Sequence, residues 1–285
     1  MKILFLFIDG LGLGPVDPAI NPVNAGVCPH LTALLAEHSR PVDARLGVPG
    51  LPQSATGQTA IFTGVNAAQL LGRHVEGFPN TTLRDVIRRD NLYRKLADCS
   101  RRSTFANAYF TDDMEQVRTF RLQSVTTVAA MSALGEVRGR SLMEQNRAVY
   151  HDLTRELLLP RGYPGPLVTP AESAAHLAAI AGEYDLTVFE YFLTDHAGHS
   201  GDMPRAVAVL QRFDAFLGVL QPLLAQAGIT LVLTSDHGNI EDMSVLTHTL
   251  NPVPFAVFGP GAAAMMARVT TLTDITAAIL AAFAE

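Results

Sequence analysis

The 285-residue chain is 48% hydrophobic and 17% charged, a composition typical of a globular protein with a large buried core. Its formal net charge of -6 argues against a general nucleic-acid-binding role, because such proteins present a basic face to phosphate. Only Cys28 and Cys99 are present, with no Cys-x-x-Cys pair, so neither a disulfide framework nor a thiolate zinc site is expected.

The amino-terminal residues 1–8 are apolar but short, and they run into Asp9 without the small-residue cleavage site of a signal peptide. No apolar run in the sequence approaches the roughly 20 residues that a membrane-spanning helix needs. We therefore expect a cytoplasmic protein with no membrane partner.

Residues 3–8 predict a buried strand that ends at Asp9. The glycine-rich segment that follows, residues 10–15, resembles a nucleotide-binding loop, but Pro15 and Pro18 prevent the helix that such a loop must open. Its glycines instead allow the backbone to turn tightly around whatever Asp9 binds.

A helix is predicted over residues 29–36, and a Pro- and Gly-rich loop over 49–58 precedes helical apolar spacing at 59–71. Ser54 therefore lies at or just before the amino terminus of a helix. It is either a helix-capping residue or a nucleophile for phosphate, whose charge the free N–H groups and the helix dipole favour.

After a predicted helix at 82–97 and strand at 103–110, residues 111–170 lose clear periodicity and contain several arginines: Arg118, Arg121, Arg138, Arg140 and Arg147. These arginines either lie on a solvated surface or belong to a small cap that clamps phosphate or carboxylate. We expect two parts: a metal-binding catalytic core, residues 1–110 and 171–285, and a small cap insertion, residues 111–170.

Helices and strands alternate in the carboxy-terminal part of the chain. Predicted helices at 171–183 and 204–227 each precede a strand, at 184–193 and 229–233, and a further strand covers 253–258. Thr273 is expected to cap a last helix that runs to residue 283. This alternation predicts an α/β fold with a mostly parallel central sheet sandwiched by helices.

Residues that bind metals follow or precede four of the predicted strands: Asp9, Asp195, His199, Asp236, His237 and His248. Because ligands gather at the carboxyl ends of parallel strands, we expect these side chains to lie together. Carboxylate and imidazole suit zinc, manganese or iron better than magnesium alone. The sequence therefore predicts two divalent metal ions that bracket the Ser54 hydroxyl.

These motifs resemble the alkaline phosphatase superfamily, and within it the metalloenzyme branch that contains cofactor-independent phosphoglycerate mutase and phosphopentomutase. The similarity covers about the first 75 and the last 100 residues, and its motifs are residues 8–12, 54–58, 195–199, 234–239 and 248–255. The resemblance implies that Asp195, His199 and His248 hold one metal. It implies a second metal at Asp9, Asp236 and His237, with Ser54 between the two as a ligand and as the nucleophile that forms a phosphoserine. Gln58, Arg73 and His74 are the expected substrate contacts.

Two features depart from the mutase pattern. Residues 55–58, Ala-Thr-Gly-Gln, replace the usual Glu-Val-Gly-His, and this makes Thr56 an alternative nucleophile outside the family register. The insertion is also much shorter than the mutase's substrate domain. A mutase must hold a dephosphorylated product while it re-orients, so a short cap favours a hydrolase.

We therefore expect a two-metal phosphomonoesterase that acts on a small organic phosphate. The alternatives are a cofactor-independent phosphomutase for a phosphoglycerate or phosphosugar, a phosphodiesterase, and a metal-binding module that has lost turnover. A sulfatase is not expected, because no Cys/Ser-x-Pro-x-Arg signal surrounds Ser54. The sequence leaves the oligomeric state open.

Overall fold

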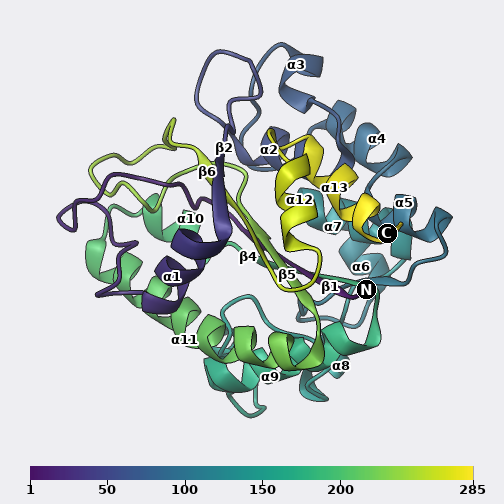
Figure 1. Cartoon of the computed structure of the whole chain (residues 1–285). Coiled ribbons are helices and arrows are strands. Elements are labelled where there is room, and N and C mark those ends of the chain that lie inside the picture. Colours follow the sequence, from purple (N-terminus) through teal and green to yellow (C-terminus); the bar gives the residue numbers. More distant parts are fainter. Residues whose placement is uncertain (285) are drawn as a thin grey trace.

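The computed structural model describes residues 1–284 and is built around a six-stranded sheet with the order β2-β6-β5-β1-β4-β3 (Figure 1). The strands are β1 (Ile3–Ile8), β2 (Ser39–Val42), β3 (Ser103–Phe105), β4 (Leu186–Tyr191), β5 (Thr230–Thr234) and β6 (Val253–Phe258). Strands β3, β4, β1 and β5 are parallel to one another, whereas β6 is antiparallel to both β5 and β2. The predicted α/β fold with a mostly parallel sheet is confirmed.

Two layers of helices cover the sheet (Figure 1). One layer contains α2 (Ser54–Thr63), α4 (Thr81–Arg89), α5 (Leu92–Asp98), α7 (Val125–Leu134), α12 (Ala262–Arg268) and α13 (Asp274–Ala282). The other layer contains α1 (Pro29–His38), α9 (Pro170–Glu183), α10 (Leu193–Gly198) and α11 (Met203–Ala227). Shorter elements connect them: α3 (Ala67–Leu71), α6 (Met114–Thr119), α8 (Arg140–Glu144) and the 3-10 helix η1 (Glu156–Arg161).

The central strand β1 shows why the apolar runs in the sequence become strands. All six of its side chains are buried, and they alternate between the two cores: Ile3, Phe5 and Phe7 face the α2 layer, whereas Leu4 and Leu6 face the α11 layer. A strand that is covered on both faces must be apolar at every position, as parallel strands usually are.

The direction of β6 matters for the position of His248. The loops after β1, β4 and β5 leave the sheet at one edge, where parallel strands end. Because β6 pairs antiparallel with β5, its first residues lie at this same edge. His248 precedes β6 and is therefore brought to the residues that follow the parallel strands.

Several predicted elements have different bounds in the structure. The helix predicted at 59–71 begins earlier, at Ser54, and is interrupted at Gly64, whose φ of 80° ends α2. The helix predicted at 82–97 is divided because the Asn91 side chain accepts hydrogen bonds from the backbone N–H groups of Tyr93 and Arg94 and so starts α5. Strand β2 and helix α12 were not predicted.

Helix α11 is the one helix among residues 1–284 that is long and apolar enough to cross a membrane by length and composition. Its buried residues, among them Leu210, Phe213, Phe216 and Leu220, belong to the core beneath the sheet. The apolar side chains of α11 therefore pack against α9 and β5.

Residues 111–170, for which the sequence predicts a cap, pack in two ways. Helix α7 contributes Val125, Val128 and Ala129 to the main core. Farther along, Met143, Tyr150, Leu158 and Tyr163 form a separate small apolar cluster. The boundaries of a cap stay a prediction.

Candidate metal centre and nucleophile

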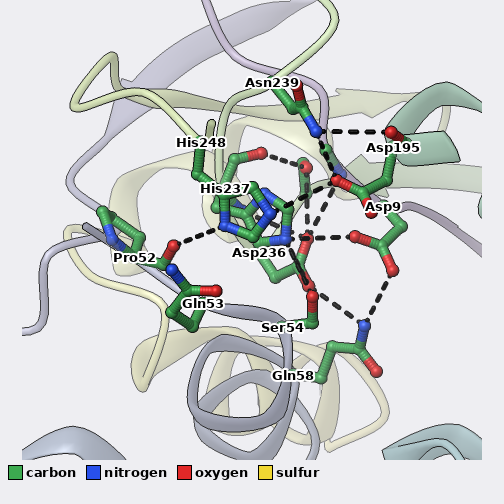
Figure 2. A network of polar contacts seen from close by, with 12 residues as sticks. Asp9, Pro52, Gln53, Ser54, Gln58, Asp195, Asp236, His237, Asn239 and His248 are labelled. Atoms are coloured by element: carbon green, nitrogen blue, oxygen red, sulfur yellow. Dashed lines mark hydrogen bonds and ion pairs between the residues drawn. The ribbon is translucent and has the colours of Figure 1, made fainter. Parts of the chain in front are cut away.

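The imidazole of His237 is surrounded by oxygen atoms from three separate segments (Figure 2). Its Nε2 atom lies 3.0 Å from Ser54 Oγ, 3.2 Å from Asp9 Oδ1 and 3.6 Å from Asp236 Oδ2. One imidazole nitrogen carries at most one hydrogen, so His237 Nε2 can donate to only one of these three oxygens. Asp9, Asp236 and His237 are thus grouped as a metal site would require.

A second group of ligand atoms adjoins the first. Asp195 Oδ1 lies 3.4 Å from His199 Nε2 and 3.5 Å from His248 Nε2, and the two Nε2 atoms are 3.0 Å apart. The rings of His237 and His248 are stacked with centroids 3.6 Å apart, so the two groups of ligand atoms are in direct contact. Asp195 and His248 group with His237 as candidate metal ligands, and His199 lies beside them.

Backbone carbonyls orient the two histidines of this second group. His199 Nδ1 lies 3.1 Å from the Leu246 oxygen, and His248 Nδ1 lies 2.8 Å from the Pro52 oxygen. A carbonyl accepts a hydrogen from Nδ1, which leaves a lone pair on Nε2. This is how the surroundings of metal sites usually hold a ligating histidine.

The charges of the first group fit a divalent cation. Burial and the charge of Asp236 raise the pKa of Asp9 well above its ordinary value. Burial lowers the pKa of His237, but the carboxylates of Asp236, Asp9 and Asp195 together raise it to about 10. Asp9 Oδ1 is also buried without a hydrogen-bond partner. A metal would take the place of the proton on His237 and would give Asp9 Oδ1 a partner.

Asp195 is held as a carboxylate. Burial opposes its charge, but the neighbouring His248 imidazole, the charge of His237 and the hydrogen bond from Asn239 hold the pKa of Asp195 well below its usual range. Asn239 Nδ2 donates to Asp195 Oδ1 at 2.7 Å (Figure 2). The side chain is therefore ready to bind a cation near neutral pH.

Ser54 is the first residue of α2, and all ten residues of this helix are buried. Its hydroxyl thus combines the free N–H groups of a helix start with the ligand groups around His237. A close approach makes this possible, because a Cβ at Gly57 would lie only 2.8 Å from the Asp236 backbone oxygen. Glycine at position 57 allows α2 to reach the loop after β5.

Gln58 and Thr56 have different surroundings on this helix. Gln58 Nε2 donates to Asp9 Oδ2 at 3.1 Å and to Asp236 Oδ2 at 3.0 Å, so this side chain joins the two carboxylates. The Thr56 hydroxyl instead donates to the Gln53 backbone oxygen at 3.1 Å. The geometry favours Ser54 over Thr56 as the nucleophile.

A cavity of about 580 Å³ adjoins the ligand groups, and Asp9, Ser54, Gln58 and Asp195 are among its lining residues. The predicted substrate contacts Arg73 and His74 are not among its lining residues, because their loop turns away: His74 faces Thr56 on the other side of α2. None of the five arginines singled out from residues 111–170 lines the cavity either.

Buried polar residues that carry no motif signal organise the site, and sequence reasoning missed them. The Glu241 carboxylate, which is fully buried, accepts hydrogen bonds from the backbone N–H groups of Gly12 and Asn239 and from the Thr249 hydroxyl. It therefore connects the loops after β1 and β5 with the loop before β6. Glu190 is buried beside the cavity, where its carboxylate accepts a hydrogen bond from Thr126.

Comparison with known proteins identifies sequences and structures similar to this chain. Residues 166–284 match the family model of the Metalloenzyme superfamily. A 119-residue region is 36% identical to a 2,3-bisphosphoglycerate-independent phosphoglycerate mutase of Ruegeria pomeroyi and covers 39% of this chain and 23% of that protein. A 97-residue region is 39% identical to the protein of the same name from Halobacterium salinarum and covers 32% of this chain and 19% of that protein. The matched region thus spans about a quarter or less of these relatives.

Solved structures share the fold over nearly the whole chain. An alkaline phosphatase from the Antarctic bacterium TAB5 superposes with a TM-score of 0.60 at 12% identity, covering 98% of this chain and 97% of that one. The PH0037 protein of Pyrococcus horikoshii superposes with a TM-score of 0.56 at 16% identity, covering 91% of this chain and 86% of that one. A Leishmania mexicana phosphoglycerate mutase gives 0.50 at 14% identity, covering 97% and 94%. The resemblance to the metalloenzyme branch with phosphoglycerate mutase is confirmed over the carboxy-terminal part of the chain, and the fold is shared with alkaline phosphatase.

Proposed function

We propose that this chain is a metal-dependent phosphoryl-transfer enzyme in which Ser54 accepts the phosphoryl group of a phosphomonoester and water then releases phosphate. The observation that carries the proposal is the position of the Ser54 hydroxyl. It lies 3.0 Å from His237 Nε2 at the start of a buried helix and beside two groups of metal-ligand side chains. The Metalloenzyme superfamily match over residues 166–284 supports the same class of chemistry.

The residues that would hold two divalent cations are those of the two groups: Asp9, Ser54, Asp236 and His237, and Asp195, His199 and His248. When bound, the cations would lower the pKa of the serine hydroxyl and offset the negative charge of the phosphoryl oxygens. The mixed carboxylate and imidazole donors favour zinc or manganese, with iron or magnesium as alternatives.

The chain's own groups account for the remaining chemistry. The Ser54 hydroxyl releases its proton to water as its oxygen forms a bond to phosphorus and the bond from phosphorus to the departing alcohol oxygen breaks. The alcohol oxygen takes up a proton from water. N–H groups at the start of α2 stabilise the phosphoryl oxygens. Water then attacks the phosphoserine, and the Ser54 oxygen leaves with a proton. Gln58 keeps the Asp9 and Asp236 carboxylates in place throughout.

Substitution of the nucleophile tests this proposal. Ser54→Ala should reduce phosphoryl transfer by on the order of 10³-fold or more, while the metal content stays nearly unchanged because six other ligands remain. Thr56→Val is the matched control, and it should keep most of the activity. Mass spectrometry of trapped protein should place the phosphate on Ser54; a phosphate on Thr56 would contradict the assignment.

A phosphomutase is the second candidate, and the names of the sequence relatives support it more directly than they support a hydrolase. The two activities differ in the fate of the phosphoryl group, which a mutase returns to another hydroxyl of the same molecule. Phosphorus NMR with a phosphoglycerate or a phosphosugar distinguishes them, because a mutase yields an isomer and a hydrolase yields free phosphate.

Several further expectations stay predictions. These are a cytoplasmic location, a small organic phosphate as substrate, and the absence of nucleic-acid and membrane partners. Phosphodiesterase activity can be tested with bis-p-nitrophenyl phosphate. A module without turnover would bind metal in elemental analysis but would release no phosphate from any ester.

A further inference from the structure

Aromatic side chains form part of the wall of the cavity beside Ser54, and polar side chains such as Gln116, Ser124 and Thr127 line the rest. Phe105, Tyr109, Phe110, Tyr150 and Phe192 all line it. Rings within this wall already lie against one another, since His151 lies 4.2 Å from the ring of Tyr150 and 4.4 Å from that of Phe192, measured between centroids. Such surfaces bind flat ring systems, because aromatic pairs are stabilised by contact area and by ring geometry.

Apolar side chains also surround the entrance. Phe78, Phe120 and Leu122 line the same cavity, although 44%, 37% and 60% of their surfaces are exposed to solvent. Exposed large apolar side chains that cluster at an opening usually mark a binding surface. A cavity of about 580 Å³ is also much larger than a phosphate group requires, and it falls in the size range of sites for organic ligands.

Positive charge is scarce in the cavity. Arg161 is its one Lys or Arg residue among the described lining residues, and this guanidinium already lies over the Phe110 ring, 5.1 Å from the centroid. The Arg161 side chain also donates to the Tyr150 hydroxyl. His151 adds no charge, because burial lowers its pKa to about 4. A substrate with a second anionic group, such as a carboxylate, would find Arg161 as the one Lys or Arg partner among the described lining residues.

We propose that the natural substrate is a phosphomonoester whose alcohol carries an uncharged planar ring system, and that the ring binds against the aromatic wall while the phosphate reaches Ser54. This inference rests on the proposed function and adds the class of substrate. It separates this chain from an enzyme that acts on a short anionic phosphate such as phosphoglycerate.

Three phosphomonoesters test the proposal with the metal-loaded full chain: 2-naphthyl phosphate, phenyl phosphate and 3-phosphoglycerate. The two aryl esters share a phenolic leaving group, so the second ring is the main difference between them. We expect kcat/KM for 2-naphthyl phosphate to exceed that for phenyl phosphate at least fivefold, mainly through KM. Consumption of 3-phosphoglycerate should be at least a hundredfold slower.

A variant at the entrance shows whether the wall causes this preference. Phe120→Ala should raise KM for 2-naphthyl phosphate about fivefold with little change in kcat. Leu70→Ala is the matched control, because Leu70 is an exposed apolar residue of α3, 52% accessible, that does not line the cavity. Equal kcat/KM for all three esters, or equal effects of the two variants, would overturn the proposed substrate class while phosphoryl transfer itself would stand.

Binding of 2-naphthol, followed by its fluorescence, tests the wall without turnover. Weaker binding to Phe120→Ala than to Leu70→Ala is expected even if no ester is hydrolysed, and that result would contradict the proposed function alone. Absence of 2-naphthol binding, or binding unaffected by Phe120→Ala, would overturn the assignment of the aromatic wall.

Discussion

The buried carboxyl group of Glu190 provides a quantitative test of the electrostatics beside the site. Burial raises the pKa of Glu190 to about 7, although the hydrogen bond from Thr126 opposes the shift, and the charge of Asp236 raises it further. The folded state therefore keeps a proton on Glu190 between pH 4.5 and about 7, where the unfolded chain has lost it. More protons are bound in the folded state, so stability falls as the pH rises through this window.

The magnitude follows from the shift. A rise from 4.5 to about 7 corresponds to about 3 kcal/mol, since each pH unit is worth about 1.4 kcal/mol. Glu190→Gln removes this titration and keeps an oxygen that can accept from Thr126. We compare the free energy of unfolding of the variant with that of the wild type. This difference should shift by about 3 kcal/mol in favour of the variant between pH 4.5 and pH 8. For a chain of this size the gain is on the order of 5 °C in Tm.

Urea unfolding of chelator-treated protein between pH 4.5 and 8 measures this difference, because chelation removes the influence of bound metal. Glu144→Gln is the control: Glu144 forms an exposed ion pair with Arg140 in α8 and should change stability by less than about 1 kcal/mol at either pH. Parallel stability profiles for the wild type and Glu190→Gln would refute the reasoning.

Three further predictions concern the arrangement of the metal centre. Removal of metal with a chelator should lower Tm at neutral pH, since the ions bind the folded state and offset the repulsion among the carboxylates; an unchanged Tm in scanning calorimetry would contradict a metal site. Gly57→Ala should destabilise by about 1–3 kcal/mol and reduce activity, because its Cβ would lie 2.8 Å from the Asp236 oxygen. Gly182→Ala, in open space on α9, should instead be neutral or stabilising. Glu241→Gln should lower the free energy of unfolding in urea by about 3 kcal/mol. The reason is that the new NH2 group would face donors whose hydrogen bonds the carboxylate now accepts. Unaltered stability would show that the three loops keep their positions without the carboxylate.

The sequence was sufficient for the fold class, and it indicated which candidate ligand side chains lie close together. Apolar runs such as 3–8 and 229–233 can be recognised without any contact map, because strands covered on both faces are apolar at every position. Asp9 comes directly after the run 3–8, and Asp236 comes shortly after the run 229–233. The carboxyl ends of parallel strands meet at one edge of the sheet. Local sequence therefore indicated which side chains gather.

Other features depended on tertiary contacts. The antiparallel direction of β6, which brings His248 to the ligand groups, is decided by pairing with β5 and not by its own residues. Arg73 was expected at the substrate because it follows the helix predicted at 59–71, but closeness in sequence does not decide which way a loop turns.

The aromatic cavity was also invisible in the sequence, since its lining residues come from segments as distant as Phe78 and Phe192 and show no common period. The same holds for Glu241, whose role exists only where three loops meet. A sequence records local periodicity and residue chemistry, whereas loop direction and long-range contacts arise only when the layers pack. That physical difference separates the grouping of the candidate ligand side chains, which could be predicted, from the lining of the cavity, which could not.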